Sequence, residues 1–287
     1  MEHLNQQLFT GERALFKARE LQISHSVFAD GESPLKESSD ILLENTIFRW
    51  KYPLWYAKHI QANGITLVET ARSGIWYTHD ITITDSVIQA PKTFRRATGI
   101  TLERVEMPNA QETLWNCSDI TLKHVHAAGD YFAMNSENIQ IADFTLSGNY
   151  AFDGAKNIEV SNAKLISKDA FWNCENVVVR DSTIIGEYLG WNSKNVTFIN
   201  CIIESNQGMC YMENVKMVNC MLINTDLAFE YSTVDVEAAT TIDSVKNPIS
   251  GTITAPGIGE LILDDPEIAA EKTKYQLAED KEYAFRF

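Results

Sequence analysis

The chain has 287 residues, of which 45% are hydrophobic and 22% charged, and its formal net charge at pH 7 is −15. This composition supplies enough apolar side chains for one large or two ordinary cores and excludes a disordered chain. No run of about 18 apolar residues exists, so we expect no membrane span. The acid excess opposes nucleic-acid binding, which depends on phosphate neutralisation by Lys and Arg.

The N-terminal segment, MEHLNQQLFTGERALF, has an early acid and lacks the apolar stretch of a secretory signal. The five cysteines are odd in number and form no C-x-x-C pair. This spacing favours reduced, buried thiols over a disulfide framework, and it predicts neither a zinc site nor an iron–sulfur cluster. We therefore expect a cytoplasmic protein without a metal or another cofactor.

From residue 21 onward an aliphatic residue recurs every 19 to 21 positions. It follows a turn-prone Asn, Asp or Gly in most repeats and precedes a second apolar residue two positions later. We call these residues the anchors. They are Leu21, Ile41, Ile60, Ile81, Ile100, Ile120, Ile139, Ile158, Val177, Val196, Val215 and Val234. A period that holds over most of a chain is the signature of a repeat architecture.

Each repeat contains three short segments of alternating apolar and polar residues, separated by Asn- and Asp-rich turns. Alternation is typical of strands, and Asn and Asp tolerate the left-handed backbone of tight turns. Stacked coils would also place these amides in a ladder. The pattern predicts an all-β fold, a single-stranded parallel β-helix of about 12 coils of about 19 residues. The right-handed form is expected, because left-handed coils have 18 residues in hexads and pentapeptide coils have a five-residue period.

The two ends break the repeat, as terminal coils do. We expect residues 1–256 to form the β-helix with an N-terminal cap, and residues 257–287 to form a short C-terminal capping segment. Asp265 and Pro266 have the pattern of a helix start, with Asp as N-cap and Pro in the first turn. A short helix is therefore expected within 266–280.

Three of the repeats, SDITLKHV, KNIEVSNAKL and ENVVVRDSTI, are accompanied by the segments WNCSD, WNCEN and WNSKN. These segments resemble a bacterial family of unknown function with a right-handed parallel β-helix of the pectate-lyase-like kind, and the resemblance covers most of the chain. The family has no established catalytic residues, so the resemblance assigns no residue a role. Some members carry a hydrogenase label. That activity implies clustered metal-binding cysteines, which this chain lacks, and we do not expect it.

Two columns of side chains stand out when the repeats are aligned. Five residues before the anchor lies the Trp column, made of Trp55, Trp76, Arg95, Trp115, Met134, Asp153, Trp172, Trp191, Cys210 and Phe229. Three residues earlier lies the Tyr column, made of Glu112, Tyr131, Tyr150, Asp169 and Tyr188. Because Arg95 and Asp153 are charged, we expect both columns to face outward as one aromatic strip.

Aromatic rings and carboxylates are the groups that bind sugar rings and their hydroxyls, so the favoured interpretation is carbohydrate binding, or a carbohydrate-active hydrolase or lyase. Asp153 and Asp169 lie on neighbouring coils and are the candidate catalytic pair, because glycosidic acid–base chemistry uses two carboxyls about 5–9 Å apart. Arg95 would hold a uronate or another carboxylate. The other expected substrate-binding residues are Glu112, Trp115, Tyr131, Tyr150, Trp172, Tyr188 and Trp191.

The sequence leaves alternatives open for this strip, including whether the chain is an enzyme at all. Exposed apolar strips usually mark interfaces, so the chain is equally read as a non-catalytic scaffold or a homo-oligomer that uses the same face. A phase error of one residue would instead place the Trp side chains in the core. A further pair, Glu106 and His126, is expected to be a surface ion pair.

Overall fold

A computed structural model describes residues 1–278 and 284–286 of the chain. It divides into two compact units, Met1–Ser147 (unit 1) and Gly148–Phe287 (unit 2), which we describe separately. Each unit is a right-handed parallel β-helix in which one turn of chain forms one coil. Helical structure in the described residues is limited to two single 3-10 turns, η1 (Glu69–Ala71) and η2 (Ala270–Lys272). None of the described helices has the length and apolarity to cross a membrane.

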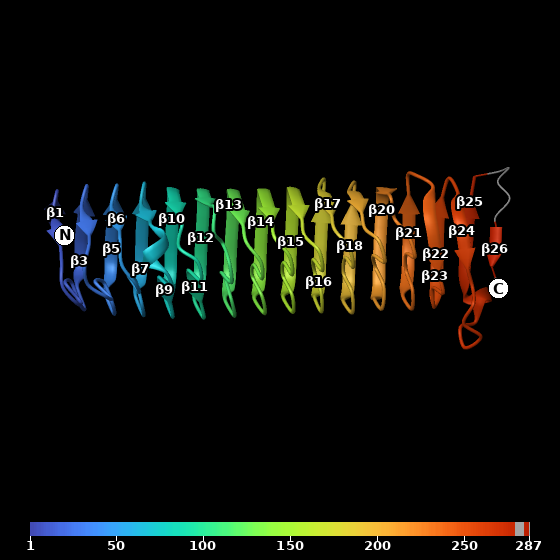
Figure 1. Cartoon of the computed structure of the whole chain (residues 1–287), viewed down its shortest axis with the longest axis horizontal. Helices are drawn as coiled ribbons and strands as arrows, with labels where there is room; N and C mark the ends of the chain where they lie inside the picture. Colours follow the sequence, from blue (N-terminus) through green and yellow to red (C-terminus); the bar gives the residue numbers. More distant parts are fainter. Residues whose placement is uncertain (279–283, 287) are drawn as a thin grey trace. The chain divides into compact units, whose positions relative to one another are not determined.

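In unit 1, parallel strands follow one another in chain order, from blue to green in Figure 1. The strands that open the successive coils are β1 (Glu2–Asn5), β3 (Arg19–Ser24), β5 (Ser39–Glu44), β7 (Lys58–Asn63), β10 (His79–Ile88), β12 (Thr98–Met107), β13 (Ser118–Ala128) and β14 (Glu137–Ser147). Shorter strands complete the coils: β2 (Leu8–Phe9), β4 (Val27–Phe28), β6 (Ile47–Phe48), β8 (Thr66–Leu67), β9 (Ile75–Trp76) and β11 (Phe94–Arg95).

Unit 2 repeats this arrangement. Its coil-opening strands are β15 (Lys156–Ile166), β16 (Glu175–Arg180), β18 (Lys194–Ile199), β20 (Glu213–Ile223), β21 (Thr233–Ala238), β23 (Ser250–Ala255) and β25 (Thr273–Leu277). The second strands of its coils are β17 (Thr183–Ile185) and β19 (Ile202–Glu204), and a separate parallel sheet contains β22 (Ile242–Lys246), β24 (Ile258–Ile262) and β26 (Ala284–Arg286).

The strand register places anchor beside anchor. In unit 1, Leu21 pairs with Ile41 and Ile41 pairs with Ile60, and in unit 2, Ile158 pairs with Val177 and so on through Val234. The predicted period is therefore confirmed. The described residues form eight coils in unit 1 and seven in unit 2, which is more than the twelve expected, because β1, β23 and β25 add coils that carry no anchor.

Turn residues hold the coils together through an amide ladder. In unit 2 the Nδ2 of each Asn donates to the Oδ1 of the Asn one coil earlier, from Asn214 to Asn195, to Asn176 and to Asn157, at 2.9–3.0 Å. All four have φ between 53° and 64°, a left-handed backbone that Asn adopts more readily than most residues. The predicted ladder is thus confirmed, and it explains why Asn or Asp precedes so many anchors.

The interior is filled by columns of apolar side chains that repeat from coil to coil. The ring of Phe28 stacks on those of Phe9 and Phe48, with centroids 4.6 and 4.8 Å apart, and Phe152 stacks on Phe171 at 5.1 Å. These centroid separations are close to the spacing of neighbouring strands. A coil has no buried face of its own, so its stability depends on the coils on either side.

The C-terminal segment differs from expectation. The helix expected within 266–280 does not form in the described residues: Ala270–Lys272 is a single 3-10 turn, and Thr273–Leu277 is strand β25, which pairs with β23. The segment TKYQL alternates in burial, a strand pattern that outweighs the Asp265–Pro266 start signal. Residues 279–283 and 287 lie outside the described part, and the division at residue 256 remains a prediction.

We expect Asn195→Ala to lower the free energy of unfolding by about 1–3 kcal/mol, because it removes two ladder hydrogen bonds and leaves a Cβ-bearing residue with a left-handed backbone. Asn195→Gly removes the same bonds without the backbone strain and is the matched control, with a smaller loss expected. Urea denaturation followed by circular dichroism measures both. Equal stability of the Ala variant and the parent would contradict this account of the ladder.

Candidate functional site

The Trp column lies on the outer side of the coil wall. Four of its five Trp residues directly follow a fully buried apolar residue, as Trp115 follows Leu114 and Trp172 follows Phe171, whereas Trp191 follows Gly190. The Trp side chains themselves are half-buried, so the indoles lie at the surface of the wall. Farther along unit 2 the column becomes buried, at Cys210 and Phe229.

In unit 1 the Trp column is a continuous stack. The rings of Trp55 and Trp76 are parallel to within 9°, with centroids 5.3 Å apart. The guanidinium carbon of Arg95 lies 4.6 Å from the ring centroid of Trp76 and 4.6 Å from that of Trp115. Both faces of Trp76 are thus covered by other side chains of the same column. Trp76 is therefore unable to offer an open ring face to a sugar.

The polar groups of this stack are also engaged within the chain. The indole nitrogens of Trp76 and Trp115 donate to the backbone carbonyls of Lys92 and Tyr131 at 2.8 and 2.6 Å. Glu112 accepts from Lys92 at 3.0 Å and lies 3.7 Å from Nη2 of Arg95. Arg95 therefore already has a carboxylate partner and two aromatic neighbours. Its expected role as a uronate ligand finds no support in this geometry.

In unit 2 the rings are arranged differently. The Tyr150 and Trp172 centroids are 6.4 Å apart and tilted by 34°, and Tyr188 meets Trp191 edge to face at 5.6 Å. Trp172 also lacks the bond that Trp76 and Trp115 make: its indole nitrogen is buried and has no acceptor in the described part of the chain. A buried donor without a partner is costly, and the Nε of Arg95 in the same column is in the same situation.

Asp153 and Asp169, the predicted catalytic pair, both lie in unit 2. Asp153 is half-buried and accepts a hydrogen bond from the Asn173 amide at 2.9 Å. Asp169 is 4% exposed, and its carboxyl oxygens are not among the buried polar atoms that lack a partner in the described residues. In the Tyr column it sits one coil after Tyr150 and one coil before Tyr188, so a small acid replaces a tyrosine ring.

The surroundings of Asp169 favour its neutral form. Burial raises the pKa of Asp169 above the ordinary range of an Asp carboxyl, the charge of Lys168 opposes the rise, and the charges of Glu187 and Asp153 add to it. Lys168 is itself paired with Glu187 at 3.3 Å. The two aspartates are thus close enough to interact electrostatically.

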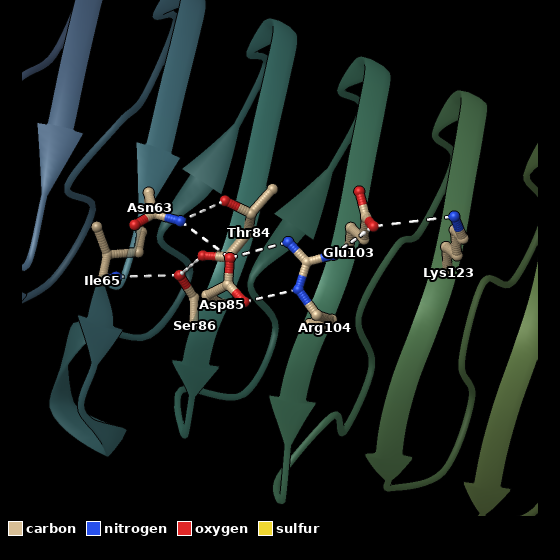
Figure 2. Close-up of polar contacts among 8 residues, drawn as sticks. All are labelled: Asn63, Ile65, Thr84, Asp85, Ser86, Glu103, Arg104 and Lys123. Carbon is tan, nitrogen blue, oxygen red and sulfur yellow. Dashed lines mark hydrogen bonds and ion pairs between the residues drawn. The ribbon is translucent and has the colours of Figure 1, made fainter.

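A second polar cluster lies in unit 1. It is formed by Asn63 at the end of β7, Asp85 within β10 and Arg104 within β12. Figure 2 shows that Arg104 donates two hydrogen bonds to the carboxylate of Asp85, from Nε at 2.6 Å and from Nη2 at 2.9 Å. The amide of Asn63, on the preceding coil, donates a third at 3.0 Å. Arg104 also pairs with Glu103. The Arg104 guanidinium lowers the pKa of Asp85. Arg104 and Asp85 are about half exposed, so we interpret this cluster as a surface network that links coils.

The other depressions and polar groups of the described residues lie outside the aromatic strip. Two shallow depressions of about 380 and 400 Å³ lie on the outer face of unit 1. Residues of strands β5, β7, β10 and β12 line them, together with Asp119 on β13. Neither depression includes a residue of the aromatic strip. His126 and Glu106 form the expected ion pair at 3.1 Å and are well exposed. No group of three or more His, Cys, Asp or Glu suited to a metal occurs in the described residues.

We expect Asp169→Asn to stabilise the protein at pH 7. Because the folded state raises the pKa of Asp169, folding is favoured while the group is protonated, and this contribution is lost as pH rises through the folded pKa. The melting temperature of the variant should therefore exceed that of the parent at pH 7, and the difference should shrink below about pH 4, the ordinary Asp range. Asp181→Asn, an exposed acid of the same unit, is the control. A lower melting temperature for Asp169→Asn would contradict the burial argument.

Comparisons with solved structures give distant likenesses. The A-module of the mannuronan C-5 epimerase AlgE4 from Azotobacter vinelandii is 10% identical, covering 99% of this chain and 88% of that one, with a TM-score of 0.31. QnrB1, a plasmid-mediated fluoroquinolone resistance protein, is 12% identical over 77% of this chain and 92% of its own, with a TM-score of 0.27. PfbA, a surface adhesin of Streptococcus pneumoniae, is 9% identical over 90% and 70%, with a TM-score of 0.27.

No curated protein matches the chain. One protein family does match, over residues 2–276, and its description is "Protein of unknown function (DUF3737)". This match confirms the resemblance drawn from the repeats. The chain, a parallel β-helix with nearly its whole length inside the match, belongs to the DUF3737 family.

Proposed function

We propose that the chain binds a saccharide on the unit 2 part of the aromatic strip and acts on it with Asp153 and Asp169. The rings of Tyr150 and Trp172 would contact the sugar. Trp191 stacks on Tyr211 at 5.0 Å, and Lys168 lies 5.1 Å from the ring centroid of Tyr188, so each of these two rings would offer only its other face. The unit 1 part of the strip has no such role in this proposal, because its indole faces are occupied by one another and by Arg95.

The observation that carries the proposal is the burial of an acidic residue, Asp169, within the Tyr column. A carboxyl group that is 4% exposed and has a raised pKa lowers the stability of the fold when it ionises. Residues that cost stability and have shifted pKa values concentrate at functional sites. A polar ligand that hydrogen-bonds to this group would relieve the penalty.

The pairing with Asp153 suggests acid–base chemistry. A carboxyl held neutral by burial is suited to donate a proton to a glycosidic oxygen, while a more exposed carboxylate beside it stays ionised. Asp169 is the buried carboxyl of the pair, with a raised pKa, and Asp153 is the more exposed one.

The test is turnover of a broad oligosaccharide panel, with release of reducing ends and of unsaturated products as readouts. We expect Asp169→Asn and Asp153→Asn each to lower turnover by at least about 10²-fold, the usual contribution of a general acid or base. Asp181→Asn removes the same charge outside the strip and should leave turnover unchanged. Circular dichroism checks that every variant folds. If both Asp169→Asn and Asp153→Asn keep the turnover of the parent, neither aspartate is catalytic.

A second candidate function, a scaffold that oligomerises, is favoured by exposed apolar side chains on β19 and β20. Ile202, Met221 and Ile223 are each 40% exposed, and exposed apolar surface often marks an interface. We expect light scattering to give a monomer, as a saccharide site open to solvent requires. A stable oligomer that dissociates in Met221→Ser or Trp191→Ala would support the scaffold instead.

A further inference from the structure

We propose that Cys201 and Cys220 form a redox-active dithiol, which hydrogen peroxide converts to a disulfide that joins two neighbouring coils of unit 2. All five cysteines are free thiols in the structure. The two thiols of the pair are buried in the coil wall, so this chemistry is independent of a saccharide bound to the outer face.

The two cysteines occupy the same position of successive coils. Strands β19 and β20 pair Ile202 with Met221, the residues that directly follow Cys201 and Cys220. The backbone is joined at this point as well, since Met221 N donates to Cys201 O at 2.9 Å. Neighbouring strands lie about 4.8 Å apart, within the range of about 4.4–6.8 Å that a disulfide spans between two Cα atoms. The pair therefore meets this distance requirement without a change of register.

Both thiols take a place that serine fills elsewhere in the same column, five residues after the anchor. One coil earlier, the hydroxyl of Ser182 donates to the backbone carbonyl two residues before it, at 2.6 Å. Cys201 and Cys220 make the equivalent contact through Sγ, at 3.3 and 3.5 Å. The two thiols thus lie on the same side of the wall, and their side chains are 1% and 0% exposed. Since a serine satisfies this position, its backbone contacts do not require two successive thiols.

The other three cysteines have different residues beside them. In the columns of Cys117 and Cys174 the next coil carries a serine, and the two backbone N–H groups donate to Ser136 Oγ at 2.9 Å and to Ser193 Oγ at 2.8 Å. Cys210 belongs to the Trp column, where its neighbours are aromatic. The register therefore selects a single pair from the five cysteines.

The environments of the two thiols assign their roles in the oxidation. A hydrogen bond from Cys201 lowers the pKa of Cys220 despite its burial, and the same bond raises the pKa of Cys201. Cys220 is thus the more readily ionised thiol, and the thiolate is the nucleophile. Its sulfur attacks one oxygen of the peroxide, the O–O bond breaks, and a sulfenic acid and one water form. The Cys201 sulfur then attacks the sulfenic sulfur, and the remaining oxygen leaves with the Cys201 proton as a second water.

An irregularity in the wall lies next to Cys220. The pairing of β20 with β21 is regular as far as Met217, which lies opposite Val236, and then shifts so that Cys220 lies opposite the small residue Ala238. Bulges disrupt the local ladder, and segments with fewer regular contacts open at lower cost. A small uncharged oxidant is suited to reach a thiol behind such a point.

The test treats the folded, reduced protein with a small molar excess of hydrogen peroxide, blocks the remaining thiols in denaturant and digests the chain with trypsin. Cleavage after Lys194 and Lys216 leaves Cys201 and Cys220 on different peptides. We expect mass spectrometry to find these peptides linked, with the loss of two hydrogen atoms, and dithiothreitol to separate them. Because Cys210 shares the peptide of Cys201, Cys210→Ala is the matched control and should keep the link.

Cys201→Ser and Cys220→Ser should each abolish the link. Both should fold, because serine already occupies this column at Ser182, and circular dichroism checks this. In the parent, oxidation should raise the melting temperature by about 5 °C, because a disulfide that closes a loop of about 20 residues restricts the unfolded chain, and dithiothreitol should reverse the rise.

Three results would overturn the proposal. The first is that the linked peptides do not form in the folded parent. The second is that they form equally in Cys201→Ser, which would place the bond at Cys210. The third is a lower melting temperature after oxidation, which would mean that the bond does not fit the stacked coils.

Discussion

The constraint on which this structure depends is the in-register hydrogen bonding of each coil to the next. Because Ile158 lies beside Val177 and Val177 beside Val196, every other residue of a coil is also placed beside its counterpart. A parallel strand finds both its backbone partners and its side-chain neighbours in the adjacent coils. The phenylalanine stacks and the asparagine ladder are consequences of this one register.

The same constraint explains why deviations from the repeat matter. In a column of like residues each side chain finds its partner in the next coil, because amides hydrogen-bond to amides and rings stack on rings. A residue that differs from its column neighbours must find another partner. Arg95 finds one within unit 1, in two indoles and Glu112. Asp169 breaks the Tyr column of unit 2 with a buried acid of raised pKa, and sites that break a local rule are where function is expected.

Much of the fold was predictable from the sequence, because register and period are properties of spacing alone. The anchors, the amide ladder and the outward direction of the Trp column all follow from a 19-residue repeat and from strand alternation. Side-chain conformation does not follow from spacing. The sequence placed Trp76 near Arg95, but it did not reveal that the ring and the guanidinium stack and so cover the faces expected to bind sugar.

The remaining differences have similar causes. The burial of Asp169 depends on how the surrounding side chains pack, which a one-dimensional pattern does not encode. At the C-terminal end, Asp265 and Pro266 gave a local helix signal, and the open edge of β23 offered backbone bonds that favoured a strand instead. Local propensity gives way where a neighbouring strand supplies unpaired groups.

The regular spacing of unit 2 also bears on how such a chain can change length during evolution. Asn176 precedes Val177 as Asn195 precedes Val196, so excision of residues 177–195 would join Asn176 directly to Val196 and restore the same Asn–Val junction. Loss or duplication of a whole coil is therefore a small genetic step that keeps the wall continuous, whereas an indel of one residue would turn inner side chains outward. Such a step removes or adds Trp191 and Tyr188 together, so the number of aromatic residues in the strip can vary by unequal recombination while the scaffold persists.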